Sequence, residues 1–217
     1  MRRCDVDSPQ PDNRIVSNND EQLILVDGDD REIGFLAKGD AHAGRGKLHR
    51  AFSLFVFKPT GELLVQQRAQ GKRLWPGYWS NTCCSHPRRG EAMDDAIRRR
   101  LLEEFGLSAE FEFLFKFRYR AQYDEQGAEH ELCWVYAGRS AQRPRENVTE
   151  IAAWRYVTPG ALQAEITCAP KTFTPWFKLS WARIVRAHSQ LLGATELLPT
   201  LPDNPGHVDA FDQPGRR

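Results

Sequence analysis

The chain has 217 residues, enough for one domain with a substantial core, and its charge is nearly balanced, with 30 Lys and Arg against 29 Asp and Glu. This balance gives no overall basic surface for nucleic acid, so any anion recognition must be local. The first residues contain no apolar run typical of a signal peptide, and no segment has the apolar length needed to span a bilayer. We therefore expect a cytoplasmic protein with neither a nucleic-acid nor a membrane partner.

The five cysteines form no paired framework; they stand at positions 4, 83, 84, 133 and 168. Cys83 and Cys84 are neighbours, and adjacent residues rarely reach ordinary disulfide geometry. A zinc finger needs a second Cys or His pair at short spacing, whereas the other cysteines stand alone. We expect no disulfide and no zinc finger. The segment WSNTCCSHP, residues 79–87, has four alternative interpretations. It could be half of a metal site, a redox pair, buried apolar packing or a reactive thiol.

The first third of the sequence predicts β structure. Residues 1–20 are polar and contain two prolines, so we expect a flexible leader. Residues 22–38 predict two short strands around an Asp-Gly turn, and residues 50–68 predict a second hairpin around a Pro-Thr-Gly turn. A Gly-containing loop with two histidines lies between the hairpins, and a basic loop follows them, residues 69–79.

A single central helix is predicted over residues 91–105. Its apolar residues keep helical spacing; they are Ala92, Ala96, Ile97, Leu101 and Phe105. Charged residues fill the remaining positions, and Gly106 stands where a C-terminal cap belongs. The sequence therefore indicates an amphipathic helix that ends at Phe105.

The remainder predicts strands and then helices. Residues 109–123 alternate, which predicts that Phe111, Phe113, Phe115, Phe117 and Tyr119 share one face of a strand. Further strands are expected at 128–138 and 152–157, and helices near 159–165 and at about 174–192. We expect residues 194–217, rich in Pro, Asp and Gly, to form a disordered tail. This order predicts an α+β protein: a mixed β-sandwich flanked by helices, in a single domain over residues 21–193.

The helix and the residues before it resemble the Nudix box. In that pattern a Gly is followed after five residues by Glu, and after seven more by Arg-Glu-apolar-any-Glu-Glu-any-Gly-apolar. Here the pattern runs from Ser85 through Glu91 and Arg99 to Glu104, Gly106 and Leu107. Ser85 replaces the first Gly, and Arg100 replaces the Glu that follows Arg99.

Arg100 has a chemical consequence. Nudix hydrolases use clustered carboxylates on this helix to bind Mg²⁺ and cut a diphosphate bond. Arg100 and Glu104 are four residues apart, so they share a helix face and can pair. An arginine at this position removes a metal ligand and adds a phosphate-binding cation. The alternative is a charged amphipathic helix with internal ion pairs only.

The segments around this helix carry a more specific resemblance. They are His42 and His49 in AHAGRGKLH, RAQGKRLWPGYWSNTCCSHP, FRYRAQYDEQGAEHELC and TFTPWF. Together, in this order and at this spacing, they resemble the type I isopentenyl-diphosphate isomerases, the metal-dependent and flavin-independent class. The resemblance covers about residues 22–192 and implies interconversion of isopentenyl diphosphate and dimethylallyl diphosphate in isoprenoid biosynthesis, in an enzyme of the Nudix superfamily.

The resemblance implies four catalytic residues. Moving the double bond requires that a proton be added at one carbon and removed at another, through a species resembling a tertiary carbocation. Cys84 and Glu131 are the implied acid–base partners, with Glu131 preferred as the donor. Tyr119 would hydrogen-bond Glu131, and Trp176 would stabilise positive charge through its ring face. Cys83 has no implied role.

The implied metal ligands are His42, His49, His86, Glu129 and Glu131. Glu129 and Glu131 are two residues apart on a predicted strand, so both point to the same face. Imidazoles and carboxylates together suit Mn²⁺ or Zn²⁺, with Mg²⁺ also accepted. Taken singly, each histidine would be an ordinary surface or core residue, so the assignment depends on the joint spacing.

The diphosphate is expected to bind to four cations, Lys38, Arg68, Lys72 and Arg100. A second Mg²⁺ would bridge the phosphates and Glu104, because Mg²⁺ prefers phosphate oxygens and keeps most of its waters. Solvent-exposed surface positions are the alternative for Lys38 and Lys72. No flavin is expected, and the resemblance suggests a monomer or a weak homodimer.

Two other functions stay open. A Nudix hydrolase of another diphosphate would need the missing carboxylate at position 100 and has no use for Cys84 with Glu131. A non-catalytic metal-binding module with this fold would bind metal without turnover, which leaves Tyr119 and Trp176 without a role.

Overall fold

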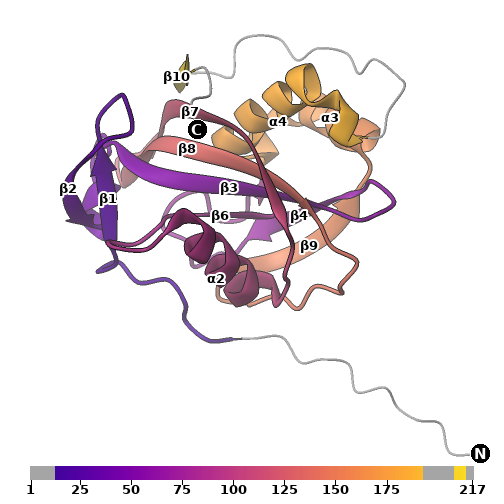
Figure 1. The fold of residues 1–217 in the computed structure, drawn as a ribbon, viewed down its shortest axis with the longest axis horizontal. Helices are drawn as coiled ribbons and strands as arrows, with labels where there is room; N and C mark the ends of the chain where they lie inside the picture. The colour runs from indigo at the N-terminus through magenta and orange to yellow at the C-terminus, as the bar shows by residue number, and fades with distance from the viewer. Residues whose placement is uncertain (1–12, 193–207, 214–217) are drawn as a thin grey trace, which may run out of the picture.

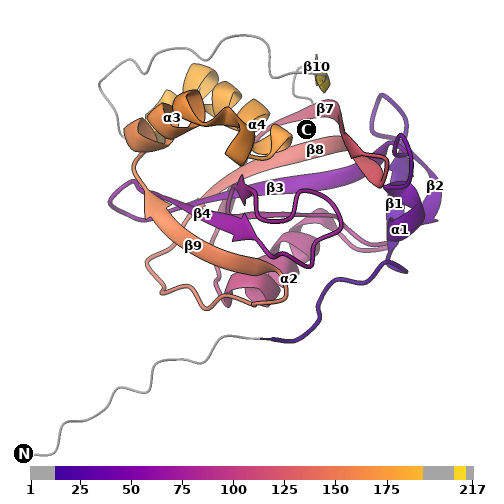
Figure 2. The ribbon, with the colours of Figure 1, turned by 180° about the vertical axis from the view of Figure 1, so that it is seen from behind.

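Strand β3 (His49–Phe57) is the central element of the fold, because four other strands pair with it. The computed structural model describes residues 13–192 and the backbone of residues 208–213 (Figures 1 and 2). Strand β8 (Gly127–Arg139) runs parallel to β3 over nine paired residues, from His49↔Glu131 to Phe57↔Arg139. The other strands that pair with β3 are antiparallel to it, so the sheet is mixed.

Two arms extend from β3. One arm continues from β8 to β7 (Phe111–Asp124) and β10 (Val208–Gln213), and the other runs from β4 (Leu63–Arg68) to β9 (Ile151–Val157) and β5 (Trp79–Ser80). The remaining described strands are β1 (Gln22–Val26), β2 (Glu32–Ala37) and β6 (Cys83–Ser85). The layers of the predicted sandwich are thus joined through β3 into one branched sheet.

Helices cover both faces of β3. Helix α2 (Met93–Phe105) lies on one face, and α3 (Pro159–Cys168) and α4 (Pro175–Ala187) lie on the other (Figure 1). Short helical segments complete the described chain: α1 (Lys38–Ala41) and 3₁₀ turns at Pro170–Thr172 and Ser189–Leu192. The arrangement confirms the predicted α+β class with flanking helices.

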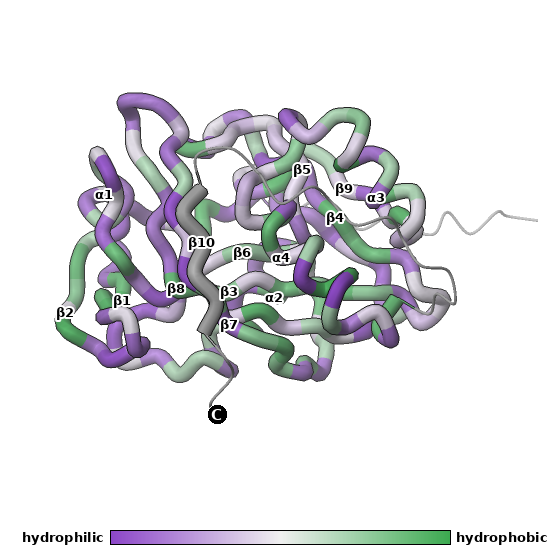
Figure 3. Tube along the Cα trace, turned by 90° about the horizontal axis from the view of Figure 1, so that it is seen from above, coloured by the Kyte–Doolittle hydropathy of each residue, from purple (hydrophilic) through white to green (hydrophobic). Residues whose placement is uncertain are grey.

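The alternation of β3 builds two cores. Phe52, Leu54 and Val56 pack with the apolar face of α2. Phe55 and Phe57 point the other way and pack with α3 and α4. Because the side chains of a strand alternate between faces, this single strand contributes to both cores. In Figure 3 β4 is also coloured as hydrophobic, and its Leu64 and Val65 divide between the same two cores.

Helix α2 forms as the sequence predicts. Ala96, Ile97, Leu101 and Phe105 are buried, and burying each larger apolar side chain contributes roughly 1.5–3 kcal/mol. Gly106 adopts φ 61°, and its N–H donates to the Leu102 carbonyl, which ends the helix. Arg100 and Glu104 are also buried on this helix, so its inner face carries charge as well as apolar side chains.

The prediction of one aromatic face along β7 is wrong. The register with β8 shifts between Phe113, which faces Tyr136, and Phe115, which faces Val135. Such a bulge inserts a residue and reverses the faces beyond it. Phe111 and Phe113 therefore pack in the α2 core, whereas Phe115, Phe117 and Tyr119 pack in the α4 core.

Residues at both ends of the described chain make contacts with the rest of the domain. Residues 208–213, expected in a disordered tail, form β10 and pair with β7 from Val208↔Ala121 to Gln213↔Lys116. The carbonyl of Arg14, in the expected leader, accepts hydrogen bonds from Asn147 Nδ2 and Thr149 Oγ1 at 2.8 and 3.1 Å. The predictions for residues 1–12, 193–207 and 214–217 lie outside the described residues. None of the described helices is long and apolar enough to cross a membrane.

Candidate active site

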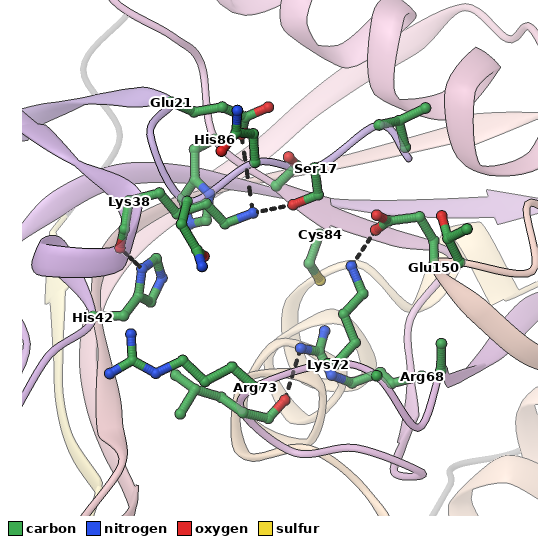
Figure 4. A pocket seen from close by; sticks show the side chains of 18 of the residues that line it. Ser17, Glu21, Lys38, His42, Arg68, Lys72, Arg73, Cys84, His86 and Glu150 are labelled. Atoms are coloured by element: carbon green, nitrogen blue, oxygen red, sulfur yellow. Dashed lines mark hydrogen bonds and ion pairs between the residues drawn. The ribbon is translucent and has the colours of Figure 1, made fainter. Parts of the chain in front are cut away.

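One pocket, with a volume of about 1230 Å³, gathers most of the residues predicted from sequence (Figure 4). The predicted residues that line it are Lys38, His42, Arg68, Lys72, Cys84, His86, Arg100, Tyr119, Glu129, Glu131 and Trp176. His49 and Glu104 are buried and do not line it. The pocket therefore brings together the thiol, the carboxylates, the imidazoles and the cations that the sequence analysis assigned to three different groups.

Five potential metal ligands meet at one side of this pocket. The ligand atoms of His42, His49, His86, Glu129 and Glu131 all lie within 4.8 Å of one another. We call these residues the His/Glu cluster. The strand register explains part of it, because His49 on β3 stands opposite Glu131 on β8, and Glu129 and Glu131 project to the same face.

The hydrogen bonds of two histidines favour a cation in the His/Glu cluster. The Nδ1 atoms of His42 and His49 lie 2.7 Å from the carbonyl oxygens of Lys38 and Lys47. A carbonyl can only accept, so each Nδ1 carries a hydrogen and the neutral ring turns the lone pair of Nε2 toward the cluster. His42 Nε2 lies 2.8 Å from Glu129 Oε2, and His49 Nε2 has no hydrogen-bond partner among the described residues. A proton or a cation must separate the first pair, so the cluster fits a divalent ion.

Burial has the largest influence on the protonation of His49 and Glu131 in the absence of a cation. Burial and the neighbouring His42 lower the pKa of His49 to about 3. Burial and the charge of Glu129 raise the pKa of Glu131 well above the usual range of a glutamate. A divalent cation bound here would instead favour the ionised carboxylates and neutral imidazoles.

A glycine allows the backbone to approach the His/Glu cluster. A Cβ atom on Gly127, at the start of β8, would lie 2.2 Å from the carbonyl oxygen of His42. The same oxygen accepts a hydrogen bond from the N–H of Ala128 at 3.0 Å. The β7–β8 turn thus holds the His42 backbone directly, and no side chain fits between them.

Tyr119 and Glu131 form a hydrogen-bonded pair. They face each other across the β7–β8 ladder, and Tyr119 OH donates to Glu131 Oε2 at 2.7 Å. Burial and the charge of Glu131 raise the pKa of Tyr119, which keeps the phenol a donor. His86 Nε2 lies 3.0 Å from the other oxygen of Glu131, so this carboxyl group joins the phenol to the His/Glu cluster.

Cys84 and Cys83 point to opposite sides of β6. Cys84 is half-buried and lines the pocket, where its Sγ lies 3.0 Å from Asn81 Oδ1 and 3.3 Å from Ser53 Oγ. Burial raises the pKa of Cys84 to about 12, despite the hydrogen bond with Ser53. Cys83 is fully buried in the α2 core, which supports its interpretation as packing.

The predicted diphosphate-binding cations already have acceptors from the protein. Arg68 donates to the carbonyls of Trp75 and Leu74 at 3.1 and 2.9 Å and lies over the ring of Trp176. Lys38 Nζ donates to Ser17 Oγ at 2.5 Å, and burial lowers the pKa of Lys38 to about 8. These cations therefore lie in the pocket in defined positions.

Lys72, Arg100, Glu104 and Glu150 form a second buried network, which we call the Lys/Arg/Glu cluster. Arg100 Nη2 donates to Glu104 Oε1 at 2.5 Å and to Glu150 Oε2 at 3.0 Å, and Lys72 pairs with the same Glu150 oxygen. The predicted pairing of Arg100 with Glu104 is thus present. Sequence reasoning missed Glu150, because it lies in a polar loop outside any motif.

Glu104 is buried and hydrogen-bonded to protein groups, whereas a carboxylate that binds Mg²⁺ needs a free oxygen. Its exposed fraction is 2%, its Oε1 accepts from Arg100, and its Oε2 accepts from Gln66 Nε2 at 3.1 Å. Both carboxylate oxygens are engaged by protein donors and the side chain does not line the pocket. A metal ion at Glu104 would have to displace these donors, and the second metal ion stays a prediction from the resemblance.

Comparisons with known proteins agree with this fold. The family model of the NUDIX domain matches residues 47–177. A solved Deinococcus radiodurans protein superposes with a TM-score of 0.60 at 23% identity, over 73% of this chain and 96% of the other, which shows the fold alone.

Curated relatives identify the class of protein within the NUDIX family more narrowly. The Photorhabdus laumondii protein named "Isopentenyl-diphosphate Delta-isomerase 1" is 44% identical over 170 residues, which are 77% of this chain and 97% of the relative. The Burkholderia multivorans "Isopentenyl-diphosphate Delta-isomerase" is 46% identical over 158 residues, 73% of this chain and 89% of the relative. The chain therefore belongs to the NUDIX family and, within it, to the isopentenyl-diphosphate Delta-isomerases.

Proposed function

We propose that this protein interconverts isopentenyl diphosphate and dimethylallyl diphosphate by adding one proton and removing another. The observation that carries the proposal is that Cys84 and the Tyr119–Glu131 pair line the same pocket as the cations Lys38, Arg68 and Lys72. A diphosphate held by the cations would place its short hydrocarbon chain beside two groups that can exchange protons. The relatives named as isomerases support the same reaction.

The reaction needs two groups that exchange roles. Toward dimethylallyl diphosphate, one group gives a proton to the terminal alkene carbon, and the other removes a proton from the carbon on the far side of the cationic centre. In the reverse direction each group performs the opposite step. Cys84 and Glu131 are the proposed pair, with Tyr119 donating to the Glu131 carboxylate. The preference for Glu131 as the donor in the forward direction stays a prediction.

The pocket also has features that stabilise a cationic intermediate. Trp176 and Tyr119 line it, with ring centroids 6.5 Å apart, and aromatic faces attract positive charge. Trp75 packs edge-on against Trp176 at 5.2 Å, which fixes the indole ring. A carbocation protected by these rings from water would lose a proton rather than gain a hydroxyl group.

The His/Glu cluster would hold Mn²⁺, Zn²⁺ or Mg²⁺. A divalent ion there supplies positive charge that keeps Glu131 in place and adjusts its proton affinity. His42 and His49 would orient their Nε2 atoms through the carbonyls of Lys38 and Lys47, as they do here. A cytoplasmic location, a monomeric or weakly dimeric state, the absence of flavin and the Mg²⁺ that bridges the diphosphate stay predictions.

NMR spectroscopy in D₂O tests the proposed function. Purified protein with Mg²⁺ and Mn²⁺ is incubated with isopentenyl diphosphate, and we expect dimethylallyl signals to grow with deuterium incorporation and without free phosphate. Release of phosphate or pyrophosphate would instead indicate a Nudix hydrolase. Bound metal without either product would indicate a binding module.

The variant Cys84→Ala identifies the reacting thiol in the same assay. Removal of an acid–base group costs about 10²–10⁴-fold in rate, so turnover should nearly disappear. Cys168→Ala is the matched control, because this exposed cysteine lies on α3, outside the pocket lining, and should leave the rate unchanged. A Cys84→Ala protein that isomerises at nearly the wild-type rate would rule out the assignment.

A further inference from the structure

Asn81 connects to Cys84 through a side chain whose orientation is fixed. Its Nδ2 donates to the carbonyls of Leu54 and Cys83 at 3.1 and 3.0 Å, and its exposed fraction is 0%. Both partners are backbone carbonyls, which can only accept, so the amide nitrogen must face them. The Oδ1 atom then faces Cys84 Sγ at 3.0 Å, where it can only accept.

Ser80 extends the same connection to Trp176. Trp176 Nε1 donates to Ser80 Oγ at 3.0 Å, and Ser80 Oγ lies 3.2 Å from Asn81 Oδ1 and 3.1 Å from Thr174 Oγ1. The indole can only donate and Asn81 Oδ1 can only accept. Ser80 therefore accepts from Trp176 and Thr174 and donates to Asn81, which uses its hydrogen and both lone pairs.

Thr174 shows that this network competes with an ordinary helix cap. It occupies the N-cap position of α4, where a threonine hydroxyl commonly accepts a backbone N–H of the first turn. Its side chain makes no such bond, is fully buried, and contacts Ser80. Two hydrogen bonds to one serine oxygen thus tie the start of α4, which carries Trp176, to strand β5.

We propose that Asn81 and Ser80 are positioning residues that fix the Cys84 thiol and the Trp176 indole relative to each other. The chain runs Trp176–Ser80–Asn81–Cys84, and both of its ends line the pocket. Buried polar groups are costly unless they are fully hydrogen-bonded, and every member here is satisfied, which makes the arrangement rigid. The assignment rests on the proposed function, in which the thiol and the indole face the same substrate.

The first test does not depend on activity. The chain has six tryptophans, and the indole N–H signal of Trp176 in a ¹H–¹⁵N spectrum is assigned by its loss in Trp176→Phe. We expect Ser80→Ala to shift this signal strongly and Asn81→Ala, one link further away, to shift it as well. Ser53→Ala is the matched control, because Ser53 contacts Cys84 from its other side and should leave the indole signal in place.

The second test is a double-mutant cycle on kcat. Asn81→Ala removes one hydrogen bond toward each end of this connection, so we expect kcat to fall about 2–10-fold with KM nearly unchanged. Asn81 and Trp176 do not hydrogen-bond each other directly, yet the loss in Asn81→Ala/Trp176→Phe should be smaller than the product of the single losses. The losses of Ser53→Ala and Trp176→Phe should multiply.

The outcomes separate this proposal from the proposed function. If the wild-type protein does not isomerise its substrate, the proposed function fails, and the indole spectra still test the connection. If Asn81→Ala leaves the Trp176 signal unmoved, or if its loss in kcat multiplies with that of Trp176→Phe, the positioning role is wrong. If Asn81→Ala does not fold, Ser80→Ala, which keeps the amide and its two carbonyl partners, carries both tests.

Discussion

The two charged clusters of the pocket differ in how their polar atoms are satisfied. In the His/Glu cluster, imidazole and carboxylate atoms face one another, and His49 Nε2 finds no hydrogen-bond partner among the described residues. In the Lys/Arg/Glu cluster, each charged group has an opposite charge beside it, with Glu150 between Lys72 and Arg100. The first cluster requires a cation to complete it. In the second every charge is paired without a ligand, and Arg100 Nε is the buried atom left without a hydrogen-bond partner among the described residues.

A ligand must therefore bind in a different way in each cluster. A cation can enter the His/Glu cluster by displacing the protons that lie between its imidazoles and carboxylates, as in the His42–Glu129 and His86–Glu131 pairs. A diphosphate can use Lys72 or Arg100 only by sharing them with Glu150 and Glu104. We therefore expect changes in the first cluster to affect cation binding and chemistry, and changes in the second to affect folding and anion affinity.

The largest expected effect is on turnover in Glu131→Gln. This variant keeps the size of the side chain but removes a proton-exchanging carboxyl group and a metal ligand. We expect isomerisation to fall by about 10²–10⁴-fold, measured by NMR with isopentenyl diphosphate. Glu112→Gln, at an exposed position of β7, is the control and should stay near the wild-type rate. Equal losses in the two variants would show that the loss of turnover does not arise from the His/Glu cluster.

Arg100→Met should have the largest effect on stability. Arg100 has an exposed fraction of 4%, and its removal leaves the buried carboxylates of Glu104 and Glu150 without their shared partner. Breaking a buried ion pair in this way costs about 3–5 kcal/mol of unfolding free energy, measured by urea denaturation. Arg98→Met is the matched control, because Arg98 is exposed on the same helix. Similar stability of both variants would show that the ion pairs of Arg100 with Glu104 and Glu150 do not stabilise the fold.

The pH dependence of stability should report on Glu150. Burial opposes ionisation of its carboxyl group, but Lys72 and Arg100 outweigh it and lower the pKa from the usual 4.5 to about 2. Because the folded-state pKa is the lower one, this stabilisation is present above about pH 4.5 and is lost as the pH falls toward 2. We expect the stability difference between wild type and Glu150→Gln to shrink by about 3 kcal/mol over this window. A difference independent of pH would contradict the ion-pair assignment.

Cation binding should produce a smaller stabilisation that is confined to the first cluster. A ligand present at one hundred times its Kd stabilises the folded state by about 2.7 kcal/mol, so Mn²⁺ should raise the Tm after treatment with EDTA. His49→Ala should abolish most of this rise, whereas Glu150→Gln should keep it. If Glu150→Gln removed the effect of Mn²⁺ equally, the two clusters would not be separate sites.

Local patterns predicted the elements of the fold better than their faces. Helix α2 follows from the spacing of its apolar residues and from Gly106, both of which act within one turn of the chain. The aromatic residues of β7 alternate as expected, but a bulge near Leu114 moves the beginning of the strand to the other core. The bulge is set by pairing with β8, so the sequence of β7 alone could not show it.

Residues of the candidate site could be predicted where they lie in a recognisable sequence motif, and not elsewhere. The resemblance assigned Cys84, Glu131 and their neighbours, and the pocket brings these residues together. Glu150 was missed as a site residue because its contacts are with Lys72 and Arg100, which are distant in sequence. Hydrogen-bond saturation of this kind appears only when the strands are placed in three dimensions.

Gly127 has a consequence for the design of mutant libraries and for the choice of residues in activity screens. Its missing side chain leaves room for the carbonyl oxygen of His42, which a Cβ atom would approach to 2.2 Å. A library restricted to ionisable or aromatic positions would pass over this glycine. Yet Gly127→Ala would displace the His42 backbone while every ligand of the His/Glu cluster kept its chemical identity. An inactive clone with all catalytic side chains intact should therefore be sequenced first at the β7–β8 turn.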